Sequence, residues 1–288
     1  MNLDGRRESN NVDDRRRSGK TTAGLGIGGL VIVGLITWLS GGNLMDVVSN
    51  LLSSGQLSNI TQTGTGHVPS AQEDEMAKFA SKVLAGTEDV WTKEFAKMGR
   101  KYVPPKMVLF SGVTQSKCGG ASSQTGPFYC SADQAVYLDV SFFNQMKEQL
   151  GAGGDFAYAY VIAHEVGHHV QYLLGTLDKI HQMQSRSSEK VSNQLSVRLE
   201  LQADFYAGIW AYNDNKMFNS LEPGDIEKGL NAASAIGDDR LQMQSQGYTV
   251  PDAFNHGTSA QRVRWLKKGA TTGQIADGDT FSPNYSDL

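Results

Sequence analysis

The stretch DFAYAYVIAHEVGHHVQYLLG, residues 155–175, contains His164, Glu165 and His168 in the order His-Glu-x-x-His. Apolar residues recur through it at near-helical spacing, and Gly175 follows the last turn, where glycine is favoured, so we predict a helix. Histidines four residues apart lie on one face of a helix and can bind a single metal ion. Two histidines and a glutamate on an otherwise apolar helix are costly to bury unless something binds them. The stretch therefore predicts a metal site on a helix.

The composition of the chain limits its class and its partners. The 288 residues have a hydrophobic fraction of 39% and a formal net charge of −4, which is ordinary for a globular protein of one large or two small domains. Nucleic-acid binding needs a strongly basic face, so we expect no nucleic-acid partner. Two cysteines, Cys118 and Cys130, are too few for a cysteine-rich zinc ribbon, but they could form one disulfide in an oxidising compartment.

The N-terminal region contains a candidate membrane anchor. Residues 21–45 are uncharged, and the segment from Ala23 to Leu39 is apolar apart from one threonine. About 17–25 such residues span a bilayer, so we predict one transmembrane helix over residues 21–40. Six basic residues precede the segment and the next one after it is Lys78, an asymmetry that predicts a cytoplasmic N-terminus and a periplasmic or extracellular domain.

A cleaved signal peptide, of the general or the twin-arginine type, is the alternative to a retained anchor. The basic region is long for a signal peptide, and no convincing cleavage site follows Trp38. We therefore expect a single-pass protein of the cytoplasmic membrane.

Composition and periodicity divide the rest of the chain. Residues 1–20 are polar and charged, as in a disordered cytoplasmic tail, and residues 41–70 have the composition of a flexible linker. The folded domain is expected over residues 71–270, followed by a C-terminal tail over 271–288. Within the domain, helical patterns predominate, with a turn at Gly86 and Thr87 between the first two, and strand patterns cover residues 107–113 and 134–139. The fold class is therefore predicted to be α+β, mostly helical with a small β-sheet.

A catalytic zinc ion is usually bound by three protein side chains, with one position left open. His164 and His168 supply two of them. Glu200 is the best candidate for the third, because it lies on a predicted helix with Asp204 one turn further along the same face. Asp204 could accept the free N–H of a ligating histidine and so fix its orientation. His169 lies about 140° around the helix from His164 and is expected to be structural.

Glu165 can serve as the general base beside such a metal. It is placed to accept a proton from zinc-bound water, whose pKa falls to about 7 in some zinc hydrolases, and to pass that proton to the leaving amine. An oxyanion would need a further donor, for which His256 and Arg262 are candidates. Both residues have simpler interpretations, a capping contact for His256 and an ion pair for Arg262. The acidic pair Asp238–Asp239 is expected on a solvated face or in a local ion pair. His181, which has no partner at ligand spacing, is expected at the surface.

Five stretches together resemble the putative neutral zinc metallopeptidase family of bacterial membrane-anchored proteins: LDGRRESNNVDDRRRSG, FYCSADQAVYLD, AHEVGHHVQ, ELQADFYAGIW and IGDDRLQ. His164-Glu165-x-x-His168 with Glu200-x-x-x-Asp204 is similar to the gluzincin pattern, in which the glutamate is the third zinc ligand and the aspartate supports a histidine. The resemblance implies one zinc ion, a zincin-like domain and hydrolysis of peptide bonds in a peptide or protein substrate. By the same analogy, the strand that binds an extended peptide would contain Gln134, Ala135, Val136 and Tyr137.

Two other functions stay open at the level of sequence. A non-catalytic, membrane-anchored binding or assembly module could contain a structural zinc, but such sites usually have four protein ligands and no use for Glu165. An amidase that acts on cell-wall peptides would share the chemistry of a peptidase, and only substrate profiling would distinguish the two.

Overall fold

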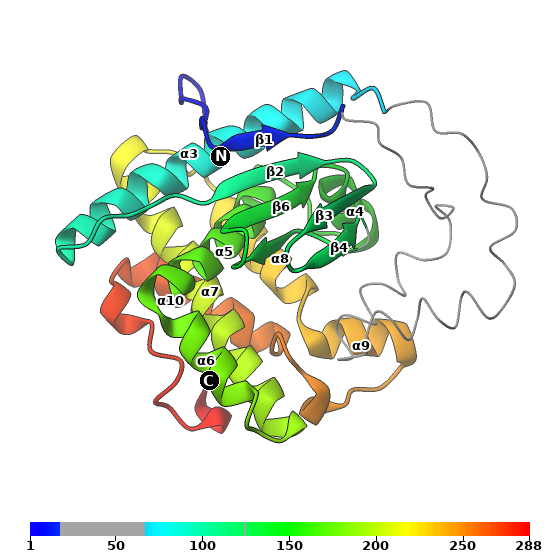
Figure 1. Cartoon of the computed structure of the whole chain (residues 1–288), viewed down its shortest axis with the longest axis vertical. Helices are drawn as coiled ribbons and strands as arrows, with labels where there is room; N and C mark the ends of the chain where they lie inside the picture. Colours follow the sequence, from blue (N-terminus) through cyan, green and yellow to red (C-terminus); the bar gives the residue numbers. More distant parts are fainter. Residues whose placement is uncertain (18–66, 124) are drawn as a thin grey trace, which may run out of the picture.

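The computed structural model describes residues 1–17, 67–123 and 125–288. Within them, a four-stranded sheet and a two-stranded hairpin lie on one side of a larger group of helices (Figure 1). The predicted α+β, mostly helical class is confirmed. The strands are β1 (Val12–Asp14), β2 (Lys106–Phe110), β3 (Val113–Ser116), β4 (Gly119–Ser122), β5 (Phe128–Cys130) and β6 (Ala135–Asp139). The helices are α3 (Ala71–Lys97), α4 (Phe142–Gln149), α5 (Asp155–Leu174), α6 (Thr176–Gln184), α7 (Glu189–Phe218), α8 (Asp225–Ala235), α9 (Asp238–Gln246) and α10 (Ser259–Thr272).

The four strands of the sheet follow the order β1-β2-β6-β5. The pairs β1–β2 and β2–β6 are parallel, whereas β5 runs antiparallel to β6. Every residue of β6 is buried, and both of its edges are hydrogen-bonded. The prediction that the strand with Gln134, Ala135, Val136 and Tyr137 is the edge that binds an extended peptide is therefore wrong. Gln134 precedes β6, and β2 and β5 already pair with both edges of β6. In the described part of the chain, β5 ends the sheet on that side.

The first 17 residues form part of the domain. β1 adds to the sheet beside β2, the guanidinium of Arg6 lies 2.8 Å from the carboxylate of Asp214 on α7, and that of Arg16 lies 3.0 Å from Asp74 on α3. The structure thus differs from the expected disordered tail, because these arginines find carboxylate partners on two helices. The expected C-terminal tail also packs on α7, where Arg198 donates to the carbonyl oxygens of Thr280 and Pro283.

The prediction of a single transmembrane helix is not supported. Residues 21–40, on which it rested, lie outside the described residues, together with most of the predicted linker over 41–70. No helix among residues 1–17, 67–123 and 125–288 is both long and apolar enough to span a membrane. The longest of them, α3 and α7, carry many charged side chains.

Helix α3 is continuous where the sequence predicted a turn. It begins with a capping box between Ser70 and Glu73 and runs through Gly86 without a break. A Cβ atom at Gly86 would lie 2.9 Å from both Arg6 Nη2 and Asp214 Oδ1. This glycine therefore makes room for the ion pair that attaches the N-terminal segment, and it does not end a helix.

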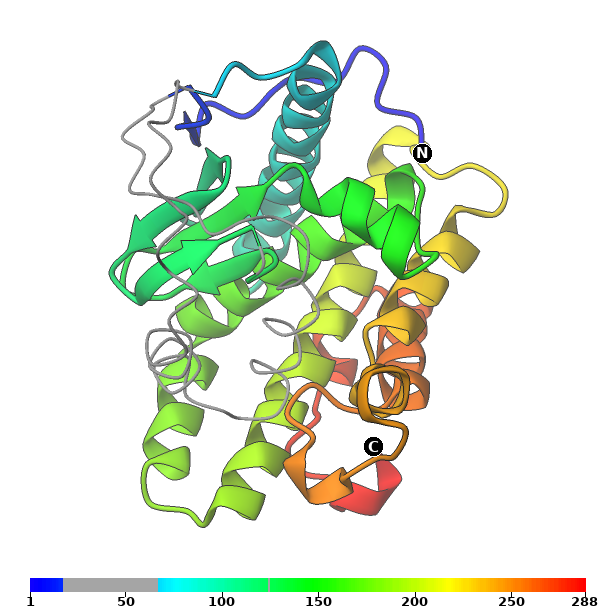
Figure 2. The same ribbon diagram turned by 90° about the vertical axis from the view of Figure 1, so that its right-hand side faces the viewer.

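Helix α5 is the centre of the fold, and it contacts both the sheet and α7 (Figure 2). Fifteen of its twenty residues are buried, as the apolar pattern of the sequence indicates. A Cβ atom at Gly167 would lie 2.9 Å from the carbonyl oxygen of Ala203 on α7. The lack of a side chain at Gly167 therefore brings α5 and α7 together at the level of the His-Glu-x-x-His motif.

Candidate metal centre

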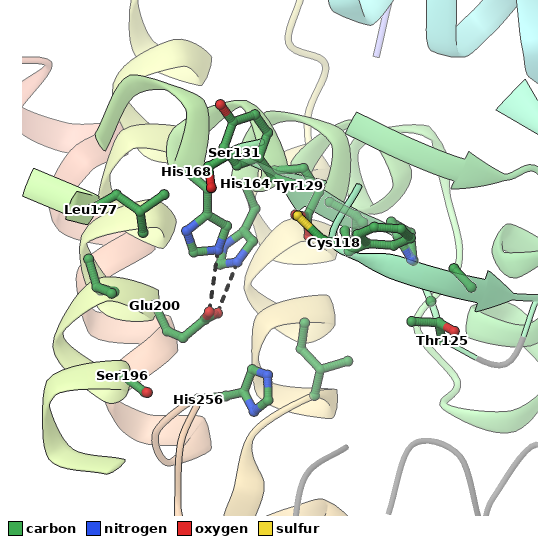
Figure 3. Close-up of a pocket in the computed structure, with 18 of the residues that line it drawn as sticks. Cys118, Thr125, Tyr129, Ser131, His164, His168, Leu177, Ser196, Glu200 and His256 are labelled. Atoms are coloured by element: carbon green, nitrogen blue, oxygen red, sulfur yellow. Dashed lines mark hydrogen bonds and ion pairs between the residues drawn. The ribbon is translucent and has the colours of Figure 1, made fainter. Parts of the chain in front are cut away.

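His164 and His168 point from α5 toward Glu200 on α7 (Figure 3). His164 Nε2 lies 3.1 Å from Glu200 Oε2, and His168 Nε2 lies 3.3 Å from Glu200 Oε1. One ligand atom from each of the three side chains lies within 4.8 Å of the other two. The structure thus brings together the three residues that were predicted from the sequence as metal ligands.

This donor set fits zinc. Two imidazole nitrogens and one carboxylate oxygen are the ligands of one common type of catalytic zinc site, in which the fourth position stays open. In both histidines the other ring nitrogen, Nδ1, contacts a protein acceptor, which leaves Nε2 for the metal. Partners of this kind fix the orientation of ligating histidines in known zinc sites.

Asp204 holds His164 in place. Its Oδ1 lies 2.8 Å from His164 Nδ1 and also accepts a 2.6 Å hydrogen bond from the hydroxyl of Tyr160. Arg262 donates to both carboxylate oxygens, from Nε to Oδ2 and from Nη2 to Oδ1. Although burial raises the pKa of Asp204, Arg262 and His164 lower it to about 2. Because an ionised carboxylate only accepts hydrogen bonds, the Nδ1 of His164 carries a proton.

The carboxylates favour positive charge at the centre of this cluster. Burial acts to lower the pKa of His164, but Asp204 and Glu200 raise it to about 10. Burial also acts to lower the pKa of His168, but Glu200 raises it. Burial acts to raise the pKa of Glu200, but the two histidines hold it well below its usual value. A divalent cation bound between these side chains would satisfy the same electrostatic preference.

Glu165 lies in the wall of the cavity beside the ligands and is buried. Burial raises the pKa of its carboxyl group, although His164 and His168 partly oppose this. A carboxylate with a raised pKa next to a metal site is suited to proton transfer.

Arg262 forms an ion pair with Asp204, in agreement with the simpler of its two interpretations. Its side chain is 2% exposed, binds Asp204 through two nitrogens and comes 3.9 Å from Glu200. It also lines the cavity.

His256 lies on the far side of the cavity from the two histidines of α5 (Figure 3). Its Nδ1 is 3.2 Å from Asp238 Oδ1, and Asp238 Oδ2 accepts the backbone N–H groups of Asn255, His256 and Gly257. Asp238 is completely buried. Of the two expectations for the acidic pair, the solvated face is therefore wrong for Asp238, which instead contacts His256 and shapes the loop that carries it.

A cavity of about 490 Å³ opens over the three candidate ligands. One wall comes from the β3–β4 hairpin and β5, and the opposite walls come from α6, α7 and the segment around α9. The predicted disulfide between Cys118 and Cys130 is confirmed, and it ties the hairpin to β5 at this cavity. His181, expected at the surface, is exposed and contributes to the cavity wall.

Three further residues belong to the site: Tyr160, Gln171 and Asp238. Tyr160 lies four residues before His164, and Gln171 three residues after His168, so helical spacing alone could have found both. Asp238 could not be found in this way, because it is 18 residues from His256 and meets it only in the fold.

Comparison with known proteins identifies the family. The profile of the family described as putative neutral zinc metallopeptidase matches residues 1–281. The uncharacterized protein YpfJ of Escherichia coli is 49% identical over 289 residues, which cover 98% of this chain and 99% of the relative. The uncharacterized protein Rv2575 of Mycobacterium tuberculosis is 46% identical over 191 residues, which cover 63% of this chain and 64% of the relative. No solved structure matches the chain. Together with the centre described above, the full-length match leads to one conclusion: the chain belongs to the putative neutral zinc metallopeptidase family.

Proposed function

We propose that this protein is a zinc-dependent peptidase in which His164, His168 and Glu200 bind one zinc ion and Glu165 is the general base. The observation that carries the proposal is the position of Glu165, which is buried beside the three ligands and lines the same cavity. A structural zinc site has no need of such a group, and it usually has four protein ligands. Among the described residues, the cluster offers three.

Each residue of the site has a role in peptide hydrolysis. Zinc would supply a Lewis acid that polarises the scissile carbonyl group and makes water a stronger acid. Glu165 would take the proton from the attacking water and donate it to the leaving amine. His256, oriented by Asp238, is a candidate donor to the negative charge that develops on the carbonyl oxygen. Arg262 would act through Asp204, which it holds in place.

The substrate would be a peptide in extended conformation. Phe128 and Tyr129 of β5 line the cavity, and β5 ends the sheet in the described part of the chain. A peptide could add to this edge through main-chain hydrogen bonds, with its scissile bond near the metal. We thus assign to β5 the role that the sequence had suggested for Gln134 to Tyr137.

The disulfide supports a location in an oxidising compartment, such as the periplasm or the cell exterior, because cytosolic thiols are kept reduced. Thiol labelling of Cys118 and Cys130 in protein taken directly from cells, before and after reduction, tests this part of the proposal. Labelling without prior reduction would contradict it.

Wild-type protein and Glu165→Gln, purified in parallel, test the peptidase proposal. We expect one zinc ion per chain in both proteins and cleavage of a peptide library by the wild type, with a rate about 10²–10⁴ lower in the variant. Mass spectrometry of the products would also separate a general peptidase from an amidase restricted to cell-wall peptides. Equal cleavage by the two proteins, or a zinc-loaded wild type that cleaves nothing, would contradict the proposal.

A further inference from the structure

Gln171 lies next to the candidate metal centre without lining its cavity. It is on α5, three residues after His168, and is completely buried. Its Oε1 lies 2.9 Å from His168 Nδ1. Its Nε2 donates to the backbone carbonyl of Leu199 at 2.7 Å and to Oε1 of Gln202 at 3.2 Å. All of these contacts lie in the space between α5 and α7.

These contacts fix the orientation of the Gln171 amide. A backbone carbonyl can only accept a hydrogen bond, so the NH₂ group must face Leu199. The opposite orientation would bring two acceptor oxygens together at 2.7 Å and also leave Gln202 Oε1 without this donor. The amide oxygen therefore faces His168.

The orientation of the amide determines where His168 carries its proton. An amide oxygen only accepts, so His168 Nδ1 must be the donor of their hydrogen bond. Nε2 is then the nitrogen that can lose its proton, and it points toward Glu200, 3.3 Å away. This assignment holds whether or not Nε2 is protonated, because Nδ1 keeps its proton in both states.

Gln171 also couples the two helices that contribute ligands. The carbonyl group that it binds belongs to Leu199, the residue before Glu200. Gln202 extends the connection, because its own Nε2 donates to the carbonyl of Gly278 in the C-terminal segment. One side chain on α5 therefore sets both the ring of His168 and the position of the neighbouring turn of α7.

From this geometry we infer that Gln171 is a positioning residue for the metal centre. It holds the ring of His168 with Nδ1 protonated and Nε2 directed at the cation. The inference rests on the proposed zinc site and adds a difference between its two histidines. His164 is held by the ionised carboxylate of Asp204, and His168 by a neutral amide. A carboxylate raises the basicity of a ligating histidine more than an amide does, so His164 becomes the stronger ligand of the pair.

Zinc affinity, measured by competition with a fluorescent chelator, tests the inference in three proteins. Gln171→Met keeps the length of the side chain but loses both its acceptor and its donors, and we expect its zinc affinity to fall about 10–100-fold. The matched control is Gln242→Met, which alters another buried glutamine, bonded to the backbone N–H of Val250. The control should bind zinc as the wild type does. Equal affinity of Gln171→Met and wild type would overturn the inference.

A second measurement needs no variant and therefore does not depend on how Gln171→Met folds. Long-range proton–nitrogen NMR spectra of histidine rings in the zinc-loaded wild type should show His168 protonated at Nδ1, with slow exchange of that proton. A proton at Nε2 instead would overturn the inference. If the wild type binds zinc in this tautomer but cleaves no peptide, the peptidase proposal fails and the role of Gln171 stands. If the wild type binds no zinc, both fail.

Discussion

The cavity has two sides that are built in different ways. The helical side, formed by α5, α7 and α10, holds the ligands in a buried hydrogen-bond network in which Asp204 alone has three side-chain partners. The strand side consists of the β3–β4 hairpin, which is mostly exposed or half-buried, and β5, which is half-buried to buried; the Cys118–Cys130 disulfide joins the two parts. Buried networks resist change, whereas exposed segments adapt more easily. We therefore expect metal binding to depend on the helical side and substrate binding on the strand side.

The largest expected effect is the loss of a ligand on the helical side. Glu200→Ala should lose nearly all of its zinc and all measurable cleavage, a greater loss than the ~10–100-fold that removal of an outer partner costs. Glu189→Ala, at the exposed start of the same helix, is the control and should keep its zinc. Metal analysis of the purified proteins makes the comparison, and full zinc content in Glu200→Ala would show that the third ligand is elsewhere.

The next prediction separates an effect on zinc affinity from an effect on the stability of the fold. Asp204→Asn should weaken zinc binding about 10–100-fold, because His164 loses its anionic partner. Asp214→Asn is a matched control, since Asp214 is a buried aspartate on the same helix that pairs with Arg6. Each change leaves an arginine with a weakened partner, Arg262 buried and Arg6 partly exposed. Loss of one member of a buried pair can cost about 3–5 kcal/mol of the unfolding free energy. Chelator competition and thermal melts should show destabilisation in both variants but weaker zinc binding only in Asp204→Asn.

A smaller effect is expected on the strand side. Replacing both Cys118 and Cys130 with serine frees the hairpin from β5, and the short loop that the disulfide closes suggests a stability loss of about 2–3 kcal/mol. We expect KM for peptides to rise several-fold, with zinc content unchanged and kcat near that of the wild type. Steady-state kinetics on samples of known zinc content provide the measurement. A fall in zinc content with KM unchanged would remove the distinction between the two sides.

The last effect concerns the pH dependence of stability, through His169, which joins the two sides. Its ring contacts the hydroxyl of Tyr129 on β5 and the carbonyl oxygen of Val103, and burial lowers its pKa to about 4. The unfolded chain binds a proton at this histidine near its ordinary pKa of about 6.5, so the folded state is favoured above that pH. Stability from this group should therefore fall by about 1.4 kcal/mol per pH unit between pH ~6.5 and ~4.

Urea unfolding across this pH range tests the contribution of His169. His169→Gln should show a clearly shallower pH dependence of stability. His181→Gln changes an exposed histidine whose pKa is also lowered by burial, and it should change the slope less. Parallel curves for wild type and His169→Gln would contradict the assignment.

The ligands were predictable because they follow local rules. His164 and His168, like Glu200 and Asp204, are four residues apart, so helical periodicity places each pair on one face before any tertiary contact is known. The contact between α5 and α7 does not follow from these local rules. Gly167 permits it, because a side chain at this position would collide with the backbone of α7.

The N-terminal segment and the edge strand could not be predicted in this way. β1 pairs Val12 with Met107, a contact between residues far apart in the sequence. An arginine-rich segment has the same sequence pattern whether its arginines flank a membrane span or form ion pairs, so the pattern does not distinguish the two. β5 has only three residues, too few for a strand pattern, so the sequence offers only the longer β6 for comparison with the gluzincin edge strand. In both cases tertiary pairing decided the outcome.

The central claim is that one zinc ion, bound on the helical side, serves Glu165 in peptide hydrolysis. Zinc content and peptide cleavage measured in the same preparations of wild type, Glu165→Gln and Glu200→Ala test it most directly. We predict one zinc ion per chain with cleavage in the wild type, one zinc ion without appreciable cleavage in Glu165→Gln, and neither in Glu200→Ala. Undiminished cleavage by Glu165→Gln, or a full complement of zinc in Glu200→Ala, would contradict it.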